Sequence, residues 1–134
     1  MPRFIDSSVI LRYLTGDDPR RARTAESIIE SDDLLVSCVI LQEVAYALRR
    51  GYGVDRRTII DTLSEFVQRE NIDVVDVPKE RLVVALAKAR ESARLSLGDA
   101  FILAQMQAAR HDEIYSFDRR FRDEGITVLE RPAS

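Results

Sequence analysis

The 134-residue chain has little of several residue types on which common active sites depend. It has one cysteine, Cys38, which excludes an intramolecular disulfide and a cysteine-based zinc cluster. It has one histidine, His111, without a nucleophile motif, which argues against Ser–His–Asp and Cys–His hydrolases. Neither G-x-x-x-x-G-K-[ST] nor G-x-G-x-x-G occurs, so no phosphate-binding loop is indicated. We expect His111 to lie near a helix end and Cys38 to be a small buried apolar residue.

Long hydrophobic runs are also missing. The longest unbroken apolar run, residues 82–87, is far shorter than the roughly 20 residues that span a bilayer. The N-terminus shows no signal-peptide pattern. Together with the single cysteine, these features predict a cytoplasmic protein that does not contact a membrane. The length predicts one domain, residues 1–134, that is large enough to bury a core without disulfides.

Lysine is scarce, and arginine supplies nearly all of the positive charge. Lys79 and Lys88 are the two lysines, so 18 of the 20 basic residues are arginine. Arginine presents a planar fork of donors that matches phosphate oxygens. The arginines cluster at residues 20–23, 49–57 and 119–122, which fits either nucleic-acid binding or solvated helix faces.

Short apolar segments alternate with helical patterns along the whole chain. This alternation predicts an α/β protein with a parallel sheet covered on both faces, and sites then gather beyond the carboxyl ends of the strands. Strands are predicted at residues 3–5, 34–36, 72–75, 114–116 and 126–128. Helices are predicted at about 6–14, 19–31, 37–50, 55–69, 79–93 and 96–110.

Four carboxylates interrupt or end apolar segments: Asp6, Glu43, Asp99 and Asp118. Acids among apolar neighbours are costly to desolvate unless a cation receives them. If the four converge, the cation best suited to bind them is a hard divalent ion such as Mg²⁺ or Mn²⁺. Setting these acids aside changes the net charge from −3 to +1.

Three of the four acids also have a local structural explanation. Asp6 can cap a helix, Asp99 can form a capping box with Ser96, and Asp118 can pair with Arg122. Glu43 has no cation at i±3 or i±4, so neither explanation covers it. Two unneutralised carboxylates about 4 Å apart cost roughly 4 kcal/mol at an effective dielectric near 20, which a bound metal ion would offset.

The segment Phe4-Ile5-Asp6-Ser7-Ser8-Val9-Ile10-Leu11 resembles the opening of PIN domains. Glu43, Gly98-Asp99-Ala100 and Ser116-Phe117-Asp118 follow in the order and spacing of that family, most closely in VapC-type toxins. The resemblance implies a three-layer α/β/α sandwich with a short central parallel sheet. It also implies Mg²⁺- or Mn²⁺-dependent endoribonuclease activity, a homodimer and a silencing antitoxin partner.

The resemblance also assigns roles to individual residues. Asp6, Glu43 and Asp99 match the core catalytic and metal-binding acids, and Asp118 matches a fourth, more variable one. Ser8 and Ser116 match positions that often carry hydroxyls, near the metal in the case of Ser8. Some relatives have an additional acid three residues before the third core acid, where this chain has Ser96.

The reaction expected of such a site is hydrolysis of RNA by metal-activated water, giving 5′-phosphate and 3′-hydroxyl ends. Other readings stay open. A PIN-type RNA-processing or quality-control nuclease fits the same residues. A metal-dependent phosphatase or receiver-like domain is disfavoured, because Asp6 lacks an adjacent acid and no lysine is obviously buried. A non-catalytic binding module is the third alternative.

Overall fold

The computed structural model describes residues 1–132. Five strands and six α-helices alternate in this part of the chain, with one short 3₁₀-helix near its end. The strands are β1 (Arg3–Phe4), β2 (Leu34–Val36), β3 (Ile72–Val74), β4 (Glu113–Tyr115) and β5 (Thr127–Leu129). The helices are α1 (Ser7–Thr15), α2 (Pro19–Ser31), α3 (Cys38–Tyr52), α4 (Arg56–Val67), α5 (Lys79–Glu91), α6 (Leu97–Ala109) and η1 (Arg122–Glu124).

Side-chain caps fix where most of the helices begin. Asp18 accepts a hydrogen bond from the backbone N–H of Arg21, and Pro19 occupies the first helical position of α2. Ser37 caps α3 through the N–H of Ile40, as its sequence position predicts. Gly16 ends α1 with a φ of 65°, a left-handed conformation that glycine adopts without a steric penalty.

All strand pairs are parallel, as the alternation of strands and helices predicts. The six helices and the parallel strands are consistent with the expected three-layer α/β/α fold. The strands are divided between two sheets, one in the order β1-β2-β3 and one formed by β4 and β5. In the first sheet Leu34 is the register partner of both Arg3 and Ile72.

β1 is an edge strand, and its side chains are exposed rather than buried as its apolar sequence suggested. Phe4 keeps 62% of its surface exposed, whereas the next residue, Ile5, is buried. The backbone N–H groups of Arg3 and Ile5 donate to Asp33 and Leu35 at β2. Because alternate residues of a strand face opposite edges, the backbone of Phe4 points away from β2.

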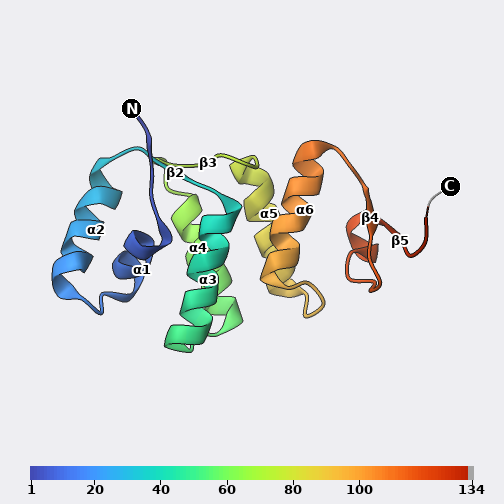
Figure 1. Cartoon of the computed structure of the whole chain (residues 1–134), viewed down its shortest axis with the longest axis horizontal. Coiled ribbons are helices and arrows are strands. Elements are labelled where there is room, and N and C mark those ends of the chain that lie inside the picture. The colour runs from blue at the N-terminus through green and yellow to red at the C-terminus, as the bar shows by residue number, and fades with distance from the viewer. Residues whose placement is uncertain (133–134) are drawn as a thin grey trace.

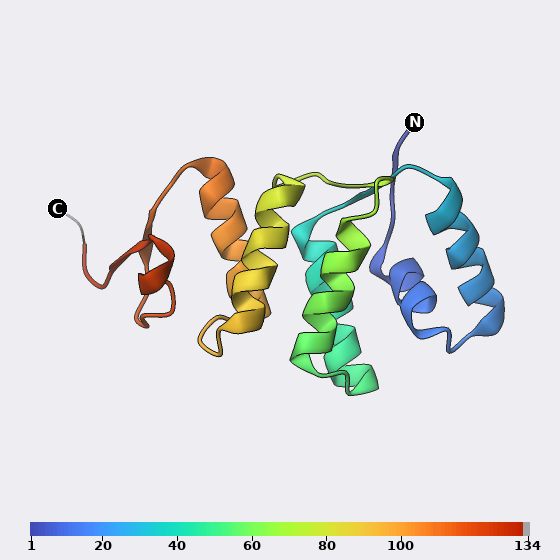
Figure 2. The same ribbon diagram turned by 180° about the vertical axis from the view of Figure 1, so that it is seen from behind.

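The elements follow one another along the long axis of the molecule (Figure 1). The α1–α2 hairpin lies near the N-terminus, α3 and α4 occupy the middle, and the β4–β5 sheet lies near the C-terminus. Figure 2, viewed from behind, shows the same order, with α5 and α6 between the central helices and the β4–β5 sheet. The β2 and β3 strands of the first sheet thus run beside the upper ends of α3 and α4, whereas the β4–β5 sheet lies beyond α5 and α6.

One connected apolar cluster holds these elements together. Val44 and Leu48 of α3, Ile60 of α4, Leu86 of α5 and Leu103 of α6 are all buried in it. Burying an aliphatic side chain of this size contributes about 1.5–3 kcal/mol, so this cluster is the main stabilising feature. Within residues 1–132, no helix combines the length and the apolar character needed to cross a membrane.

Candidate active site

Asp6 lies at the junction of β1 and α1 and caps the helix. Its Oδ2 accepts hydrogen bonds from the Ser8 hydroxyl at 2.8 Å and from the Ser8 backbone N–H at 3.3 Å. These donors favour the charged form, so they lower the pKa of Asp6 below its ordinary value. The carboxylate itself is exposed to solvent. Ser8, which the family resemblance places near the proposed metal, therefore holds and orients Asp6.

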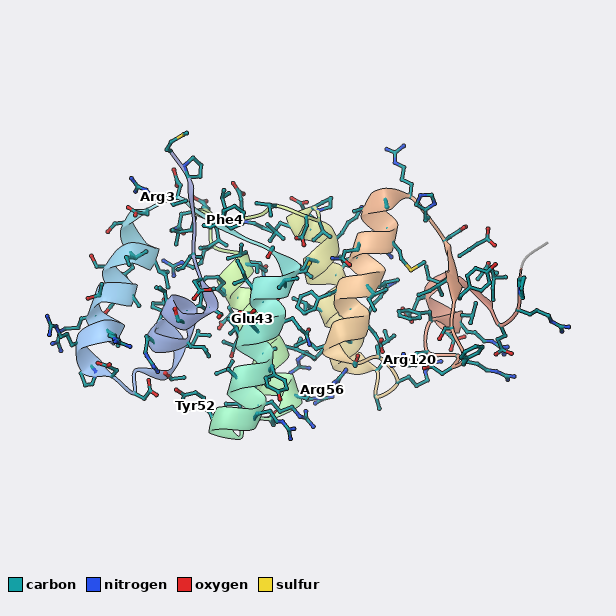
Figure 3. The ribbon with its side chains drawn as sticks, in the orientation of Figure 1. Arg3, Phe4, Glu43, Tyr52, Arg56 and Arg120 are labelled. Carbon is teal, nitrogen blue, oxygen red and sulfur yellow. The ribbon has the colours of Figure 1, made fainter. Side chains whose placement is uncertain are left out.

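Glu43 reaches the same region from α3. Its Oε2 accepts a hydrogen bond of 2.9 Å from the hydroxyl of Ser7, the residue between Asp6 and Ser8. Packing of α1 on α3 makes this contact. Two acids that are 37 positions apart in the sequence are thus linked through one turn of α1. Figure 3 shows Glu43 midway along α3.

Asp99 is the one buried acid of the four, with 3% of its surface exposed. It forms the predicted capping box at the start of α6: Ser96 N–H donates to Asp99 Oδ2 at 2.9 Å, and Asp99 N–H donates to Ser96 Oγ at 3.0 Å. Arg120 adds an ion pair, with its Nη1 3.5 Å from Asp99 Oδ2. These partners offset the cost of burying the charge.

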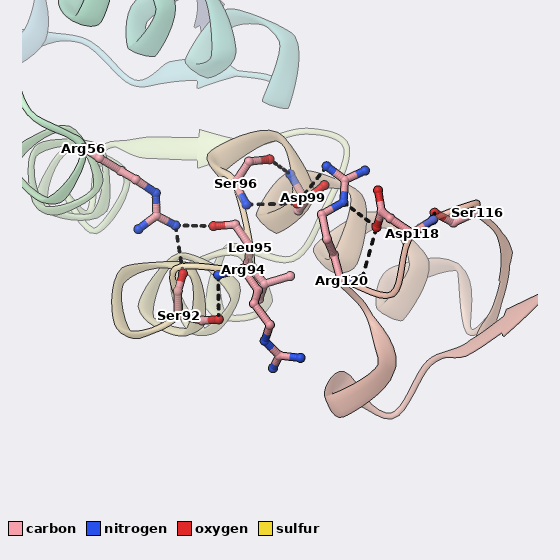
Figure 4. Close-up of polar contacts among 9 residues, drawn as sticks. All are labelled: Arg56, Ser92, Arg94, Leu95, Ser96, Asp99, Ser116, Asp118 and Arg120. Atoms are coloured by element: carbon pink, nitrogen blue, oxygen red, sulfur yellow. Dashed lines mark hydrogen bonds and ion pairs between the residues drawn. The ribbon is translucent and has the colours of Figure 1, made fainter.

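Asp118 lies in the turn after β4 and also binds Arg120. Its Oδ1 accepts from Arg120 Nε at 2.8 Å and from the Arg120 backbone N–H at 3.1 Å. Ser116 accepts a hydrogen bond from the Asp118 N–H through its hydroxyl. Arg120 consequently bridges Asp99 and Asp118 (Figure 4).

The four acids form two pairs, Asp6 with Glu43 and Asp99 with Asp118. The sequence predicts that they meet at one point; the contacts of the described residues connect the acids within each pair. Over residues 1–132, no group of three acidic, histidine or cysteine side chains is placed to hold a metal ion. The desolvation argument applies to Asp99 alone, because the other three carboxylates are exposed.

Each pair nevertheless has the chemistry of a divalent-cation ligand set. Mg²⁺ prefers oxygen donors and is often held by one or two carboxylates while it keeps several waters. Asp6 and Glu43 supply such donors, with the Ser7 and Ser8 hydroxyls beside them. At the other pair, the positive charge of Arg120 already lies between the carboxylates.

Sequence reasoning missed two contributors to the site. Arg120 was visible only as a member of an arginine cluster, and the spacing instead suggested Arg122 as the partner of Asp118. An arginine two residues after a turn aspartate is the signal that would have identified it. Ser7 has no local sequence signal, because its contact with Glu43 depends on the packing of two helices.

Cys38 and His111, the remaining candidate nucleophile and base, lie outside the site. Cys38 is buried, as predicted, and burial together with the carboxylate of Asp76 raises its pKa to about 12. A thiol with this pKa stays protonated at neutral pH and is a poor nucleophile. His111 lies just past the end of α6, near the position that the helix pattern predicts.

Ser8 provides a test of the charge state of Asp6. In the Ser8→Ala variant the pKa of Asp6 should rise toward its ordinary value, because the hydroxyl donor is lost. A depressed folded-state pKa contributes stability above the unfolded pKa and loses it as the pH falls through the folded pKa. The variant should therefore have a smaller contribution of this kind at neutral pH, and its stability should fall less than that of the wild type as the pH drops through the two pKa values.

An NMR titration of the Asp6 side chain measures this shift directly. Ser31→Ala is a suitable control, because Ser31 is exposed at the end of α2 and has no contact with Asp6. An Asp6 pKa that is the same in Ser8→Ala as in the wild type would contradict the assigned hydrogen bond.

Comparison with known proteins identifies the family. A comparison with curated proteins gives no match. The PIN domain family model matches residues 3–125, a span that begins at β1 and ends after η1. All four acids and both auxiliary serines fall inside it. Because this match covers most of the chain, the protein belongs to the PIN domain family.

Proposed function

We propose that this protein is an Mg²⁺- or Mn²⁺-dependent endoribonuclease and that it is the toxin of a toxin–antitoxin pair. PIN domains are in general nucleases, and they typically use divalent metal ions. The observation that carries the proposal is the position of the four acids relative to the strands and helices. Asp6 and Asp118 follow strands, while Glu43 and Asp99 lie in the first half of helices.

The proposed ligands are Asp6, Glu43, Asp99 and Asp118. A divalent ion held there would lower the pKa of an attacking water and offset the charge that develops on the phosphate. The protein keeps Asp6 ionised through Ser8 and orients Glu43 through Ser7. The capping box fixes Asp99. These contacts reduce the reorganisation that the carboxylates need when substrate binds.

The proposal requires the two pairs to approach each other during catalysis. Asp118 is carried by the turn after β4, and Asp6 by the turn after β1, so movement of the β4–β5 sheet would change their separation. Arg120 would travel with Asp118, because both lie in the same turn. Substrate phosphate is a natural partner for this guanidinium once Asp99 and Asp118 bind a metal ion.

The substrate, the protein partners and the cellular compartment are also proposals. We propose RNA as substrate, a separate antitoxin protein as inhibitor, and the cytoplasm as the compartment. A homodimer is also proposed, supported by exposed apolar side chains such as Val39 on α3. Most of the apolar stripe on α3 is used within one chain, however, because Val44 and Leu48 pack in the core.

Controlled expression in a bacterial host tests the toxin role. Induction of the wild type should arrest growth and fragment cellular RNA, whereas Asp6→Asn should do neither at equal protein levels. Co-expression of the reading frame next to this gene should restore growth if it encodes the antitoxin. Normal growth with a wild type that cleaves RNA in vitro would favour a processing nuclease. Release of phosphate from phosphomonoesters with RNA left intact would favour a phosphatase.

A further inference from the structure

A groove lies between α3, the start of α4 and the loop that joins α5 to α6. Its volume is about 470 Å³, and it is lined by both polar and apolar side chains. The residues that matter for its chemistry are Tyr46, Arg49, Arg56, Arg94, Ser96 and Gly98.

The groove is bordered by two of the elements that carry the proposed ligands. Gln42 lines one side and is the residue before Glu43, while Gly98 lines the other and is the residue before Asp99. A ligand in this groove would therefore contact both α3, which carries Glu43, and the start of α6, which carries Asp99. No other groove with this relation to both elements is found in the described part of the chain.

The groove offers one exposed aromatic ring and two accessible cations. Tyr46 keeps 61% of its surface exposed, and the Arg50 guanidinium lies over its ring at 5.7 Å from the centroid. Arg49 is exposed and forms no ion pair within residues 1–132. Arg94 pairs with Asp123 but remains half exposed. Aromatic rings beside basic side chains are the combination that binds single-stranded nucleic acid.

The far wall of the groove is held in place by a third arginine. Arg56 donates through Nη2 to the carbonyl oxygens of Ser92 and Leu95, which ties the α5–α6 loop to α4 (Figure 4). The carbonyl oxygen of Ala89 in α5 is a third acceptor. Three backbone acceptors on one guanidinium fix the loop before any ligand arrives. A pre-formed wall lowers the ordering cost of binding.

We propose that this groove binds one nucleotide of single-stranded RNA, with its base stacked on Tyr46 and the flanking phosphates on Arg49 and Arg94. Arg50 covers one face of the Tyr46 ring, so the base takes the other face. The cationic lining favours a phosphate-bearing ligand over an apolar peptide. This inference rests on the proposed ribonuclease function and names where its substrate strand is held.

The test measures binding in a full-length protein that does not turn over. Fluorescence anisotropy of a labelled single-stranded RNA 12-mer is recorded with Asp6→Asn and with Asp6→Asn carrying Tyr46→Ala, Tyr46→Phe or Arg49→Ala. Circular dichroism confirms that each variant is folded. Arg81→Ala is the matched arginine control, because Arg81 is exposed on α5 and lies outside the groove.

Tyr46→Ala should raise Kd about tenfold, whereas Tyr46→Phe should keep binding because the ring remains. Arg49→Ala should reduce the slope of log Kd against log salt by about 0.7, the value for one phosphate contact on a single strand. Arg81→Ala should change neither quantity.

The inference is overturned if Tyr46→Ala binds as tightly as its parent, if Tyr46→Phe loses as much affinity as Tyr46→Ala, or if the parent binds no RNA. A short acidic peptide that binds the groove where RNA does not would also overturn it. These results are separable from failure of the proposed function. If the wild type cleaves RNA but Tyr46→Ala does not weaken RNA binding, only the proposed role of the groove is refuted. If the protein binds RNA through Tyr46 but the wild type does not cleave it, only the proposed nuclease activity is refuted.

Discussion

Replacing Asp6 by Asn is expected to lower the rate of RNA cleavage about 100-fold or more. Asn caps a helix about as well as Asp does, so α1 keeps its cap and the main loss is the negative charge. A catalytic metal ion supplies several kcal/mol of stabilisation to the transition state, and each 1.36 kcal/mol changes a rate about tenfold. The measurement is the initial rate of cleavage of an end-labelled single-stranded RNA in excess Mg²⁺.

Asp18→Asn is the matched control for this substitution. Asp18 caps α2 through the backbone N–H of Arg21, as Asp6 caps α1, but it is not one of the proposed ligands. The control should cleave within about twofold of the wild type, since Asn also caps a helix well and Asp18 is only partly buried. Wild-type cleavage by Asp6→Asn, with partner binding retained, would instead favour a non-catalytic binding module and contamination as the source of any nuclease signal.

Removing divalent cations is expected to reduce cleavage by about three orders of magnitude or more. In the proposed reaction a bound ion would activate the water and offset charge, and the described residues place no histidine, lysine or reactive thiol at the acids to replace it. Excess EDTA should stop cleavage, and Mg²⁺ or Mn²⁺ should restore it. The products should carry 5′-phosphate and 3′-hydroxyl ends, identified by mass spectrometry.

Thermal stability provides the control for the chelation experiment. The apolar cluster is built from side chains of the chain itself, so the thermal unfolding midpoint should be nearly the same with and without EDTA. Loss of activity would then report on chemistry rather than on unfolding. Full activity in excess EDTA, or products ending in 2′,3′-cyclic phosphate, would contradict the metal-activated water.

Local sequence signals predicted the individual elements well, because caps and stops act over a few residues. Ser37 begins α3, Asp18 with Pro19 begins α2, and Ser96 with Asp99 forms the capping box of α6. Each of these depends on a side chain within three positions of the backbone group that it satisfies. The sequence also predicts the five strands, with bounds that differ by at most one residue at either end.

The long-range arrangement was harder to predict, because strand pairing depends on contacts between distant segments. The apolar residues at β1 suggested burial, yet β1 lies at an edge and Phe4 is exposed. Likewise, nothing in the pattern of strands and helices indicated that β4 and β5 form a sheet of their own. An apolar pattern predicts that a segment is extended, but it does not identify the neighbouring strand.

The candidate site was predicted in part for the same reason. Choosing Asp6, Glu43, Asp99 and Asp118 required only their order and their apolar neighbours. Their partners depend on packing: Ser7 reaches Glu43 from another helix, and Arg120 reaches Asp99 from beyond β4. Convergence of all four acids stays a prediction, because the structure links them as two pairs.

Mn²⁺ binding by the wild type and by single variants at the four acids tests this convergence most directly. Electron paramagnetic resonance titration gives the affinity without any need for turnover. If the four carboxylates share one ion-binding site, Asp6→Asn, Glu43→Gln, Asp99→Asn and Asp118→Asn should each weaken binding, by at least about tenfold for the three core acids. Wild-type affinity in both Asp99→Asn and Asp118→Asn would show that the pairs act separately and would contradict a shared metal site.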